Sequence, residues 1–449
     1  MSNANPVELS GWGAYPRVEC IVEQAETRGD IVRRLDHSGT IARGLGRSYG
    51  DAALNRGGQV LDLTLFNRYH AFNEDTGDLT CDAGVSLADI IRDFVPRGWF
   101  PAITPGTKYV TVGGCIANDI HGKAHHSQGS FANCVKALTI LLADGTVVTA
   151  NRNENADLFW ANFGGMGLLG IILSATITLR RVETSYFHQK PIIVRDLEHL
   201  LEELEINDHL PYSVAWIDPL VTGARLGRGV LTVGDHARQK DLPADLAGAP
   251  LKIKRSPLFT VPIELPWFSL NPITLRILNA VISRVLANGA SFAHYEKFFY
   301  PLDAVGHWYR GYGRPGFTQY QFVIPLEDGL KNMRALLETI AVSGQLPFLN
   351  VLKKLGPSSP GHLSFPFEGY TFAIDFPVRT GLSDLLSRLD QMVVDVGGRI
   401  YLGKDAFLSA PLLRPMYPRL DEWLHIKATV DPRNQFTSDL GRRVGLIPQ

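Results

Sequence analysis

Three glycine-rich segments carry the clearest chemical signal in this sequence. They read GLGRSYGD at 44–51, PGTKYVTVGGCIANDIHGKAHHSQGS at 105–130 and FGGMGLLGII at 163–172. Backbone amides without side chains can approach an anion closely, and such loops commonly bind phosphate groups. Glycines that serve only tight turns are the alternative, which explains one such segment more easily than three. Together the segments predict a site for an extended diphosphate.

The first segment matches neither of the standard phosphate-binding loops. A dinucleotide-binding loop reads G-x-G-x-x-G and opens a helix. Here Gly44, Gly46 and Gly50 span one residue more, and the turn-like residues DAALNRGG precede a strand. The pattern G-x-x-x-x-G-K-[ST] does not occur. The diphosphate must therefore be held in a different fold.

His121 and His125 are spaced as two metal ligands on one helical face would be. Gly122 interrupts the stretch and no acidic residue completes a ligand set, so we expect no metal. A hydrogen-bonded loop histidine is the simpler interpretation of His121. A proton acceptor is the functional one, because imidazole titrates near neutrality. Lys404 follows a strand-like run, where a single lysine is usually a solvated surface group.

Short strands are predicted around the glycine segments. The residues at 79–95 read as a strand followed by an amphipathic helix. Asp-Gly between two apolar runs at 135–150 predicts a hairpin, and 170–182 predicts another strand. The first part of the chain is therefore expected to be rich in short strands.

Two strands predicted in the second half alternate in polarity. Gln319 and Gln321 share one face of 318–325, and Thr371, Ala373 and Asp375 share one face of 370–378. A face exposed to solvent is the default interpretation of either strand alone. A pocket wall is the alternative for the pair.

The segment 250–290 differs from the rest, because five prolines fall within 250–272. Prolines exclude a regular helix there, and we expect no long helix in the whole segment. One interpretation is a packed connection with buried aromatic residues. The other is a mobile lid or membrane-surface contact built from basic and large apolar residues, which are Lys252, Lys254, Arg255, Leu258, Phe259, Trp267 and Phe268.

Composition is that of a globular protein. The 449 residues predict two domains, or three, and 44 basic against 45 acidic residues leave no excess charge for nucleic acid. No secretory signal and no run of about 18 apolar residues is present. We therefore expect a cytoplasmic location, with peripheral membrane contact as the alternative. Four scattered cysteines predict neither a disulfide framework nor a zinc site: Cys20, Cys81, Cys115 and Cys134.

The segments 42–55, 105–131 and 157–172 closely resemble the FAD-binding domain of the vanillyl-alcohol-oxidase-type flavoenzymes. More narrowly, they resemble the decaprenylphosphoryl-β-D-ribose 2′-oxidase branch. The resemblance continues in GFTQYQFVIP, FLNVLKKLGP, YTFAIDFPV and GGRIYLGKD, and fades near 250–290. It implies a two-domain α+β protein: an FAD-binding domain at 1–184, a substrate-binding domain built on an antiparallel sheet at 185–398, and a return to the first domain at 399–449.

The resemblance implies one FAD and the residues that contact it. Many relatives in the wider family bond flavin to a histidine where Tyr49 stands, and tyrosine cannot form that link. Non-covalent FAD is therefore expected, with Cys115 and His121 as the remaining candidates for a covalent bond. The expected contacts are Ala42, Arg43, Gly44, Leu45, Gly46, Arg47, Ser48, Tyr49, Gly50, Asp51, Ala52, Gly106, Thr111, Val112, Gly113, Gly114, Asn118, Asp119, Ile120, His121, Ile172 and Tyr401.

Catalytic roles are implied for Tyr49, His121, Lys353 and Lys404. Lys404 is expected at the pyrimidine edge of the flavin, where a cation would stabilise the reduced anion. Lys354 adjoins Lys353, so that assignment could shift by one residue. Residues implied to line the sugar pocket are Trp216, Tyr312, Gln321, Asn350, Lys353 and Ala373.

Two positions depart from the mycobacterial members of the branch. They carry a cysteine where Ala373 stands and an asparagine where Thr371 stands. Flavin chemistry does not need that thiol, so oxidation should survive while the substrate is less certain.

The reaction implied is oxidation of the 2′-hydroxyl of a polyprenyl-phosphoryl-β-D-ribofuranose to the 2′-keto sugar. A separate NAD(P)H-dependent reductase would then complete epimerisation to the arabinose. The alternatives are an FAD-dependent oxidase of another sugar or polyol, and a non-catalytic protein that binds flavin or polyprenyl phosphate.

Overall fold

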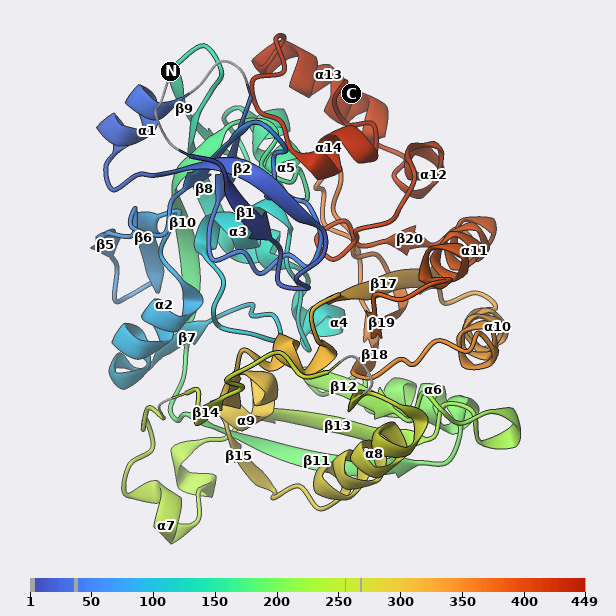
Figure 1. Cartoon of the computed structure of the whole chain (residues 1–449). Helices are drawn as coiled ribbons and strands as arrows, with labels where there is room; N and C mark the ends of the chain where they lie inside the picture. The colour runs from blue at the N-terminus through green and yellow to red at the C-terminus, as the bar shows by residue number, and fades with distance from the viewer. Residues whose placement is uncertain (1–4, 36–38, 255, 267–268, 449) are drawn as a thin grey trace.

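The computed structural model describes residues 5–35, 39–254, 256–266 and 269–448. Within them, a four-stranded sheet has the order β1-β2-β4-β3 (Figure 1). β1 is antiparallel to β2, whereas β2, β4 and β3 run parallel. The strands are β1 (Val7–Ser10), β2 (Arg17–Gln24), β3 (Thr40–Arg43) and β4 (Gln59–Asp62).

A six-stranded antiparallel sheet follows, with the order β5-β6-β10-β8-β9 and with β7 also paired to β10. The hairpin predicted at 135–150 is β8 and β9, and the strand predicted at 170–182 is β10. The strands are β5 (Tyr69–Phe72), β6 (Asp78–Asp82), β7 (Trp99–Pro101), β8 (Val135–Leu141), β9 (Val147–Asn151) and β10 (Ile171–Arg181).

The second half builds an eight-stranded sheet of order β15-β11-β13-β12-β18-β19-β17-β20. β14 (Phe259–Thr260) and β16 (Val305–Gly306) form a separate short pair. The eight strands are β11 (Tyr186–Val194), β12 (Tyr212–Ile217), β13 (Gly229–His236), β15 (Phe292–His294), β17 (Phe317–Pro325), β18 (Asn350–Leu355), β19 (Gly369–Pro377) and β20 (Arg399–Ile400).

β17 and β19 lie inside this sheet, and every residue of β19 is buried. The interpretation that their polar residues face solvent is therefore wrong. α6 (Leu197–Ile206), α10 (Gly329–Val342) and α11 (Leu382–Asp395) lie along one side of the sheet, and α8 (Pro272–Ala287) lies near β11 and β13 (Figure 1). The alternation itself is as predicted, because the side chains of Gln319 and Gln321 donate to those of Asp375 and Thr371 across the two strands.

The longer helices are α2 (Leu87–Phe94), α6 (Leu197–Ile206), α8 (Pro272–Ala287), α10 (Gly329–Val342), α11 (Leu382–Asp395) and α13 (Leu420–Val430). The shorter ones are α1 (Arg28–Arg34), α3 (Val112–Ala117), α4 (His125–Gln128), α5 (Ala156–Asn162), α7 (Ala244–Ala247), α9 (Tyr295–Phe299), α12 (Ala410–Met416) and α14 (Asp439–Arg443). None of the described helices is both long and apolar enough to cross a bilayer.

α8 corrects the expectation of no long helix within 250–290. Pro272 occupies the first helical turn, where its missing N–H costs nothing. The side chain of Asn271 accepts from the backbone nitrogens of Ile273 and Thr274 at 2.9 and 3.1 Å. Proline and its cap therefore start this helix instead of excluding it.

The C-terminal residues lie against the first half of the chain. Trp423 Nε1 donates to the carbonyl of Ala161 at 3.1 Å, and Lys427 Nζ donates to that of Leu168 at 2.7 Å. Arg443 of α14 donates to Asp51 in the loop after β3 at 2.7 Å. This return brings 399–449 to the cavity described next.

Candidate active site

The loop after β3 is pressed against two other segments at its glycines. A Cβ on Gly44 would lie 2.2 Å from Thr111 Oγ1, and one on Gly50 would lie 1.9 Å from the carbonyl oxygen of Asp405. Gly46 has a φ of +63°, in the region that favours glycine. The absence of side chains at Gly44 and Gly50 therefore allows three segments to pack closely around one space.

A cavity of about 690 Å³ lies between this loop, α3 and the eight-stranded sheet. All the residues predicted to contact FAD line it, except Asp51, Val112 and Asp119. Thr111 caps α3 by accepting from the Gly114 nitrogen at 3.2 Å. The structure therefore gathers two of the glycine segments, and Met166, Gly167 and Gly170 of the third, at one site.

The three exceptions support the cavity wall from behind. Asp51 accepts from Arg443 Nε and Nη2 at 2.9 and 2.7 Å. Asp119 is fully buried, and it accepts from Ser130 Oγ at 2.9 Å and from the Ala132 nitrogen at 3.0 Å. Val112 belongs to the apolar core.

Four of the predicted sugar-pocket residues line the same cavity, namely Trp216, Asn350, Lys353 and Ala373. Gln321 and Tyr312 lie one layer behind. The Tyr312 hydroxyl donates to Asp375 at 3.0 Å, and its ring stacks on Phe317 with centroids 4.1 Å apart.

His121 is held by a chain of hydrogen bonds that ends at Thr371. The Thr371 hydroxyl donates to the Phe322 carbonyl at 2.7 Å and accepts from Gln321 Nε2 at 3.1 Å. Gln321 Nε2 also lies 2.9 Å from His121 Nε2, which must therefore accept. The remaining imidazole proton is then on Nδ1, a buried atom with no hydrogen-bond partner among the described residues.

Burial lowers the pKa of His121 well below its usual value, and the charge of Lys353 acts in the same direction. The ring is therefore neutral at physiological pH. His125 is engaged elsewhere, because its Nδ1 accepts from the Gly356 nitrogen at 3.1 Å.

Lys353 and Lys404 differ in their electrostatic surroundings. Burial, together with the charges of Lys404 and Lys123, lowers the pKa of Lys353 to about 7. Burial lowers the pKa of Lys404 to about 8, but the nearby Asp375 carboxylate opposes that effect. Lys404 therefore keeps its positive charge to a higher pH than Lys353. Its Nζ lies 5.7 Å from the centre of the Tyr49 ring.

The lysine on β18 that faces the cavity is Lys353. Its Nζ donates to the Gly122 carbonyl over a long 3.4 Å. Lys354 points the other way and pairs with Glu205 at 2.6 Å and Asp208 at 3.3 Å. Alternation along the strand thus settles which of the two adjacent lysines belongs to the site.

Sequence reasoning missed several residues of this cavity. Lys123 lines it, and burial lowers the pKa of Lys123 to about 7. Gln319, which the sequence had placed on a possible pocket wall, also lines it and donates to Asp375 at 2.5 Å, where burial raises the carboxyl pKa to about 7. The signal for Lys123 was its place two residues after His121. Nothing local in the sequence indicates that Asp375 meets Gln319 and Tyr312.

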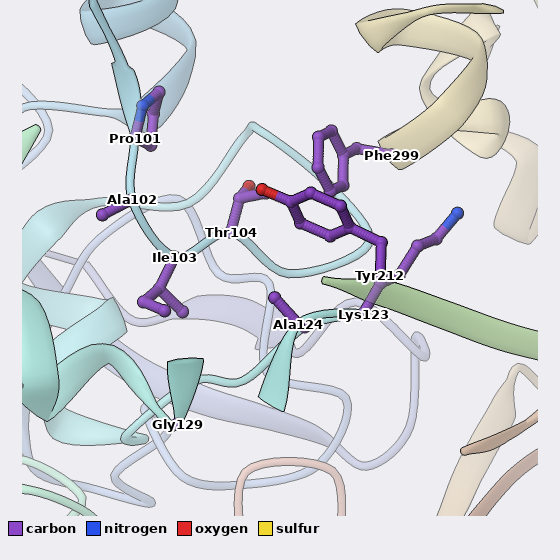
Figure 2. Close-up of a pocket in the computed structure, with 10 residues that line it drawn as sticks. Pro101, Ala102, Ile103, Thr104, Lys123, Ala124, Gly129, Tyr212 and Phe299 are labelled. Atoms are coloured by element: carbon purple, nitrogen blue, oxygen red, sulfur yellow. The ribbon is translucent and has the colours of Figure 1, made fainter. Parts of the chain in front are cut away.

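Figure 2 shows a second, much smaller cavity of about 10 Å³ beside residues 101–104. Thr104, Lys123, Tyr212 and Phe299 contribute to its walls. A space of this size holds at most about one water molecule. It is a packing gap and not a ligand site.

The large cavity fits a dinucleotide cofactor on two observations. Its wall includes six glycines whose backbone carries no side chain, as a cradle for a diphosphate requires, and these are Gly44, Gly46, Gly50, Gly106, Gly113 and Gly114. Residues that line it carry buried polar atoms without partners in the described chain, which are Arg47 Nε, His121 Nδ1, Trp216 Nε1 and Gln319 Oε1. Polar atoms left in this way indicate groups that a bound molecule would satisfy.

Comparison with known proteins agrees with this geometry. The FAD-binding-domain family model matches residues 18–151. A decaprenylphosphoryl-β-D-ribose oxidase of Mycolicibacterium smegmatis is 39% identical over 98% of this chain and 97% of its own length. The chain belongs to this family of FAD-binding oxidases. More distantly, an L-gulono-1,4-lactone dehydrogenase of Mycobacterium tuberculosis is 23% identical over 94% of this chain and 92% of its own length.

Membership of this oxidase family assigns FAD as the cofactor of the cavity. Cys115 lies in the core and does not line the cavity, whereas Tyr49 and His121 do. Non-covalent attachment stays a prediction from Tyr49.

Proposed function

We propose that the protein oxidises the 2′-hydroxyl of a polyprenyl-phosphoryl-β-D-ribofuranose to the 2′-keto sugar. The observation that supports this most is that His121, Lys353 and Lys404 line the same cavity as the glycine loop. The 39% identity to a decaprenylphosphoryl-β-D-ribose oxidase supports the choice of substrate.

FAD, when bound, supplies the acceptor for the hydride that leaves the sugar carbon. The segments 42–52, 111–114 and 118–121 would hold it. Lys404 remains protonated beside Asp375 and would stabilise negative charge in the cavity.

We assign to Lys353 the role of the base that accepts the proton of the 2′-hydroxyl group. A lysine whose pKa is about 7 is partly neutral at physiological pH and can accept a proton. His121 is less suited, because its Nε2 already accepts from Gln321 and its Nδ1 carries the proton. The neutral imidazole would instead donate from Nδ1 to an oxygen of the substrate.

The keto product lacks the stereocentre at C2′, so a later reduction from the opposite face gives the arabinose. We place a separate NAD(P)H-dependent reductase at that step. It is a partner in the reaction sequence and is not required for the oxidation itself.

Anaerobic bleaching of the bound flavin tests the proposal. Farnesyl-phosphoryl-β-D-ribofuranose should bleach the 450 nm region in a single turnover, and its 2′-deoxy analogue should not. L-gulono-1,4-lactone and simple polyols serve as competing substrates. Bleaching by one of these and not by the ribose substrate would favour the other sugar or polyol oxidase. No bleaching by any compound would favour a binding protein.

A further inference from the structure

The cavity extends past the sugar pocket into an arm that no part of the oxidation uses. On the sheet side this arm is walled by one face of β11, β12 and β13. Cross-strand pairs place these residues together, since Thr232 pairs with both Pro191 and Val214, and Trp216 pairs with Val230. On the helix side the cavity is lined by Val281, Ile282, Val285 and Leu286 of α8.

The arm is continuous with the site because Trp216 belongs to both. Trp216 is on β12 next to Ile217, whose carbonyl accepts from the Asn350 side chain at 2.9 Å. Asn350 and Lys353 line the sugar end of the same cavity. Apart from Gln189, Thr232 and Trp216, the side chains of these strands and of α8 that line the cavity are aliphatic, so an apolar chain attached to a bound sugar phosphate would find mostly apolar walls there.

The outer side of α8 is also apolar. Ile273, Ile277, Val281 and Val285 recur every four residues, and they are 70%, 60%, 54% and 56% exposed. Residues at this spacing share one face of a helix. We call these four residues the α8 stripe. Val281 and Val285 belong both to the stripe and to the cavity lining, so the arm opens at the stripe.

Charge on α8 is of one sign. The helix carries Arg276 and Arg284 and contains no acidic residue. An exposed apolar stripe beside basic residues is the pattern of a helix that lies at the surface of an anionic bilayer. Asn279 fixes the helix on its inner side by donating to Asp218 at 2.9 Å.

We propose that the α8 stripe docks on an anionic membrane and that the arm beneath α8 receives the first part of the prenyl chain as it leaves the bilayer. This inference rests on the proposed function, since it needs a substrate with an apolar chain. The chain would run from the membrane, between α8 and the sheet, to the phosphate and sugar near Lys353. The binding of the chain would hold the ribose at the end of the cavity where oxidation takes place.

A substrate series of increasing chain length tests the arm. β-D-Ribofuranosyl phosphates esterified with dimethylallyl, farnesyl and longer prenyl alcohols should show KM falling with length in the wild type. Val230→Trp fills the arm and should reduce the fall of KM with chain length by about tenfold or more. Keeping about two methylene groups of the prenyl chain out of an apolar site already lowers affinity by that factor. Flavin bleaching by the dimethylallyl compound should be reduced less than bleaching by the farnesyl compound.

Ile282→Glu tests the same wall from the helix side, in case Val230→Trp fails to fold. FAD content and melting temperature identify a folded variant. A folded variant that keeps the full chain-length preference would overturn the arm. A wild type that is bleached by no member of the series would overturn the proposed function instead.

Vesicle sedimentation tests the docking. Wild type should bind phosphatidylglycerol vesicles and bind phosphatidylcholine vesicles weakly. Ile273→Glu/Ile277→Glu should lose binding about tenfold or more, because charged side chains would enter the interface. Neither residue lines the cavity, so oxidation of the dimethylallyl substrate should continue. Val342→Glu is the matched control, because Val342 is an exposed valine on α10.

Equal binding of wild type and the double variant would overturn the docking, as would no vesicle binding at all. Analytical ultracentrifugation separates one further occupant. A wild-type dimer that the double variant dissociates, without vesicle binding, would assign the stripe to a second copy of the chain.

Discussion

At the scale of single residues, the carboxylate of Asp375 gives the two lysines of the site, Lys353 and Lys404, different roles. Asp375 opposes the loss of charge on Lys404, whereas the charged groups that act on Lys353 in the described part of the chain are the lysines Lys404 and Lys123. Two groups of the same type can therefore serve as cation and as proton acceptor at the same pH. The pH dependence of flavin reduction follows from this difference.

The rate of flavin reduction should rise as pH increases through about 7 and fall as pH increases through about 8. Lys353 must lose its proton to act as a base, and Lys404 must keep its proton to remain a cation. Lys353→Met should remove the rising limb and lower the rate by about 10²–10⁴-fold. Stopped-flow measurements across pH 5–10 provide the test, and an unchanged rising limb would rule out Lys353 as the base.

Lys404→Ala should lose roughly 2–4 kcal/mol of transition-state stabilisation, by analogy with removal of one charge-stabilising donor. The falling limb of the pH profile should disappear with it. FAD content should stay near that of the wild type, which is read from the flavin-to-protein absorbance ratio. A rate close to the wild-type value would exclude the assigned role.

Tyr49 leads to a prediction about how FAD is attached. Its ring packs edge-on against Phe317, with centroids 5.5 Å apart, and burial raises the pKa of its phenol well above the usual value. A neutral phenol at this position offers no histidyl link to the flavin. Acid precipitation should therefore leave the yellow colour in the supernatant, whereas flavin fluorescence on the denatured protein band would show a covalent bond.

At the scale of elements, the loop after β3 depends on the absence of side chains. Gly50→Ala would place a methyl group 1.9 Å from a backbone carbonyl, which cannot move as a side chain can. We expect a loss of about 1–3 kcal/mol in stability and a lower FAD content, because the loop must shift. Gly248→Ala is the control, since a Cβ there meets nothing within 4 Å. Equal FAD content and melting temperature in the two variants would contradict this account.

Periodicity and turn chemistry made several elements predictable. The β8–β9 hairpin follows from Asp-Gly between apolar runs, and α2 begins at a capping box of Ser86 and Asp89. α8 was not predicted, because Pro272 reads as a helix breaker until its place in the first turn is known. Tertiary packing decides whether a proline interrupts a helix or begins one, and a single sequence does not contain that packing.

The site was predictable to a similar degree and for related reasons. Glycine loops mark the cofactor cavity locally, so nearly all of their residues line it. Asp51 and Asp119 were expected to contact FAD but support the loops from behind. Their partners, Arg443 and Ser130, have no periodic relation to them in the sequence. Contacts between distant segments, such as Gln319 with Asp375, could not be predicted for the same reason.

The exposed residues of 256–266 also bear on the choice made for 250–290. Leu258 and Phe259 are exposed, so the packed connection with buried aromatics is wrong for Phe259. Arg255, Trp267 and Phe268 lie outside the described residues. What the structure adds is α8, whose apolar stripe was not part of the sequence-based interpretation.

At the scale of the whole molecule, the C-terminal helix α14 meets the glycine loop behind the cofactor cavity. Arg443 of α14 pairs with Asp51 of the glycine loop and with Asp405, with a shortest distance of 2.7 Å in each case. Both carboxylates are almost fully buried. The last helix therefore fixes both the loop after β3 and the segment that carries Lys404.

Arg443→Met should destabilise the protein by about 3–5 kcal/mol, because it leaves two buried carboxylates without their partner. FAD affinity should fall as well, since both anchored segments line the cavity. Burial already raises the pKa of Asp51 and Arg443 opposes that effect, so the pKa of Asp51 should rise further without the arginine. The cost of burying the Asp51 carboxylate is then largest at high pH and is relieved as the acid takes up a proton, so the difference in stability should narrow between pH 7 and pH 5. Thermal unfolding followed by circular dichroism, with and without added FAD, measures both effects.

Arg414→Met is the matched control, because its pair with Asp421 is exposed to solvent and should contribute little. An Arg443→Met protein as stable as this control would show that α14 and the glycine loop are held together by apolar packing alone.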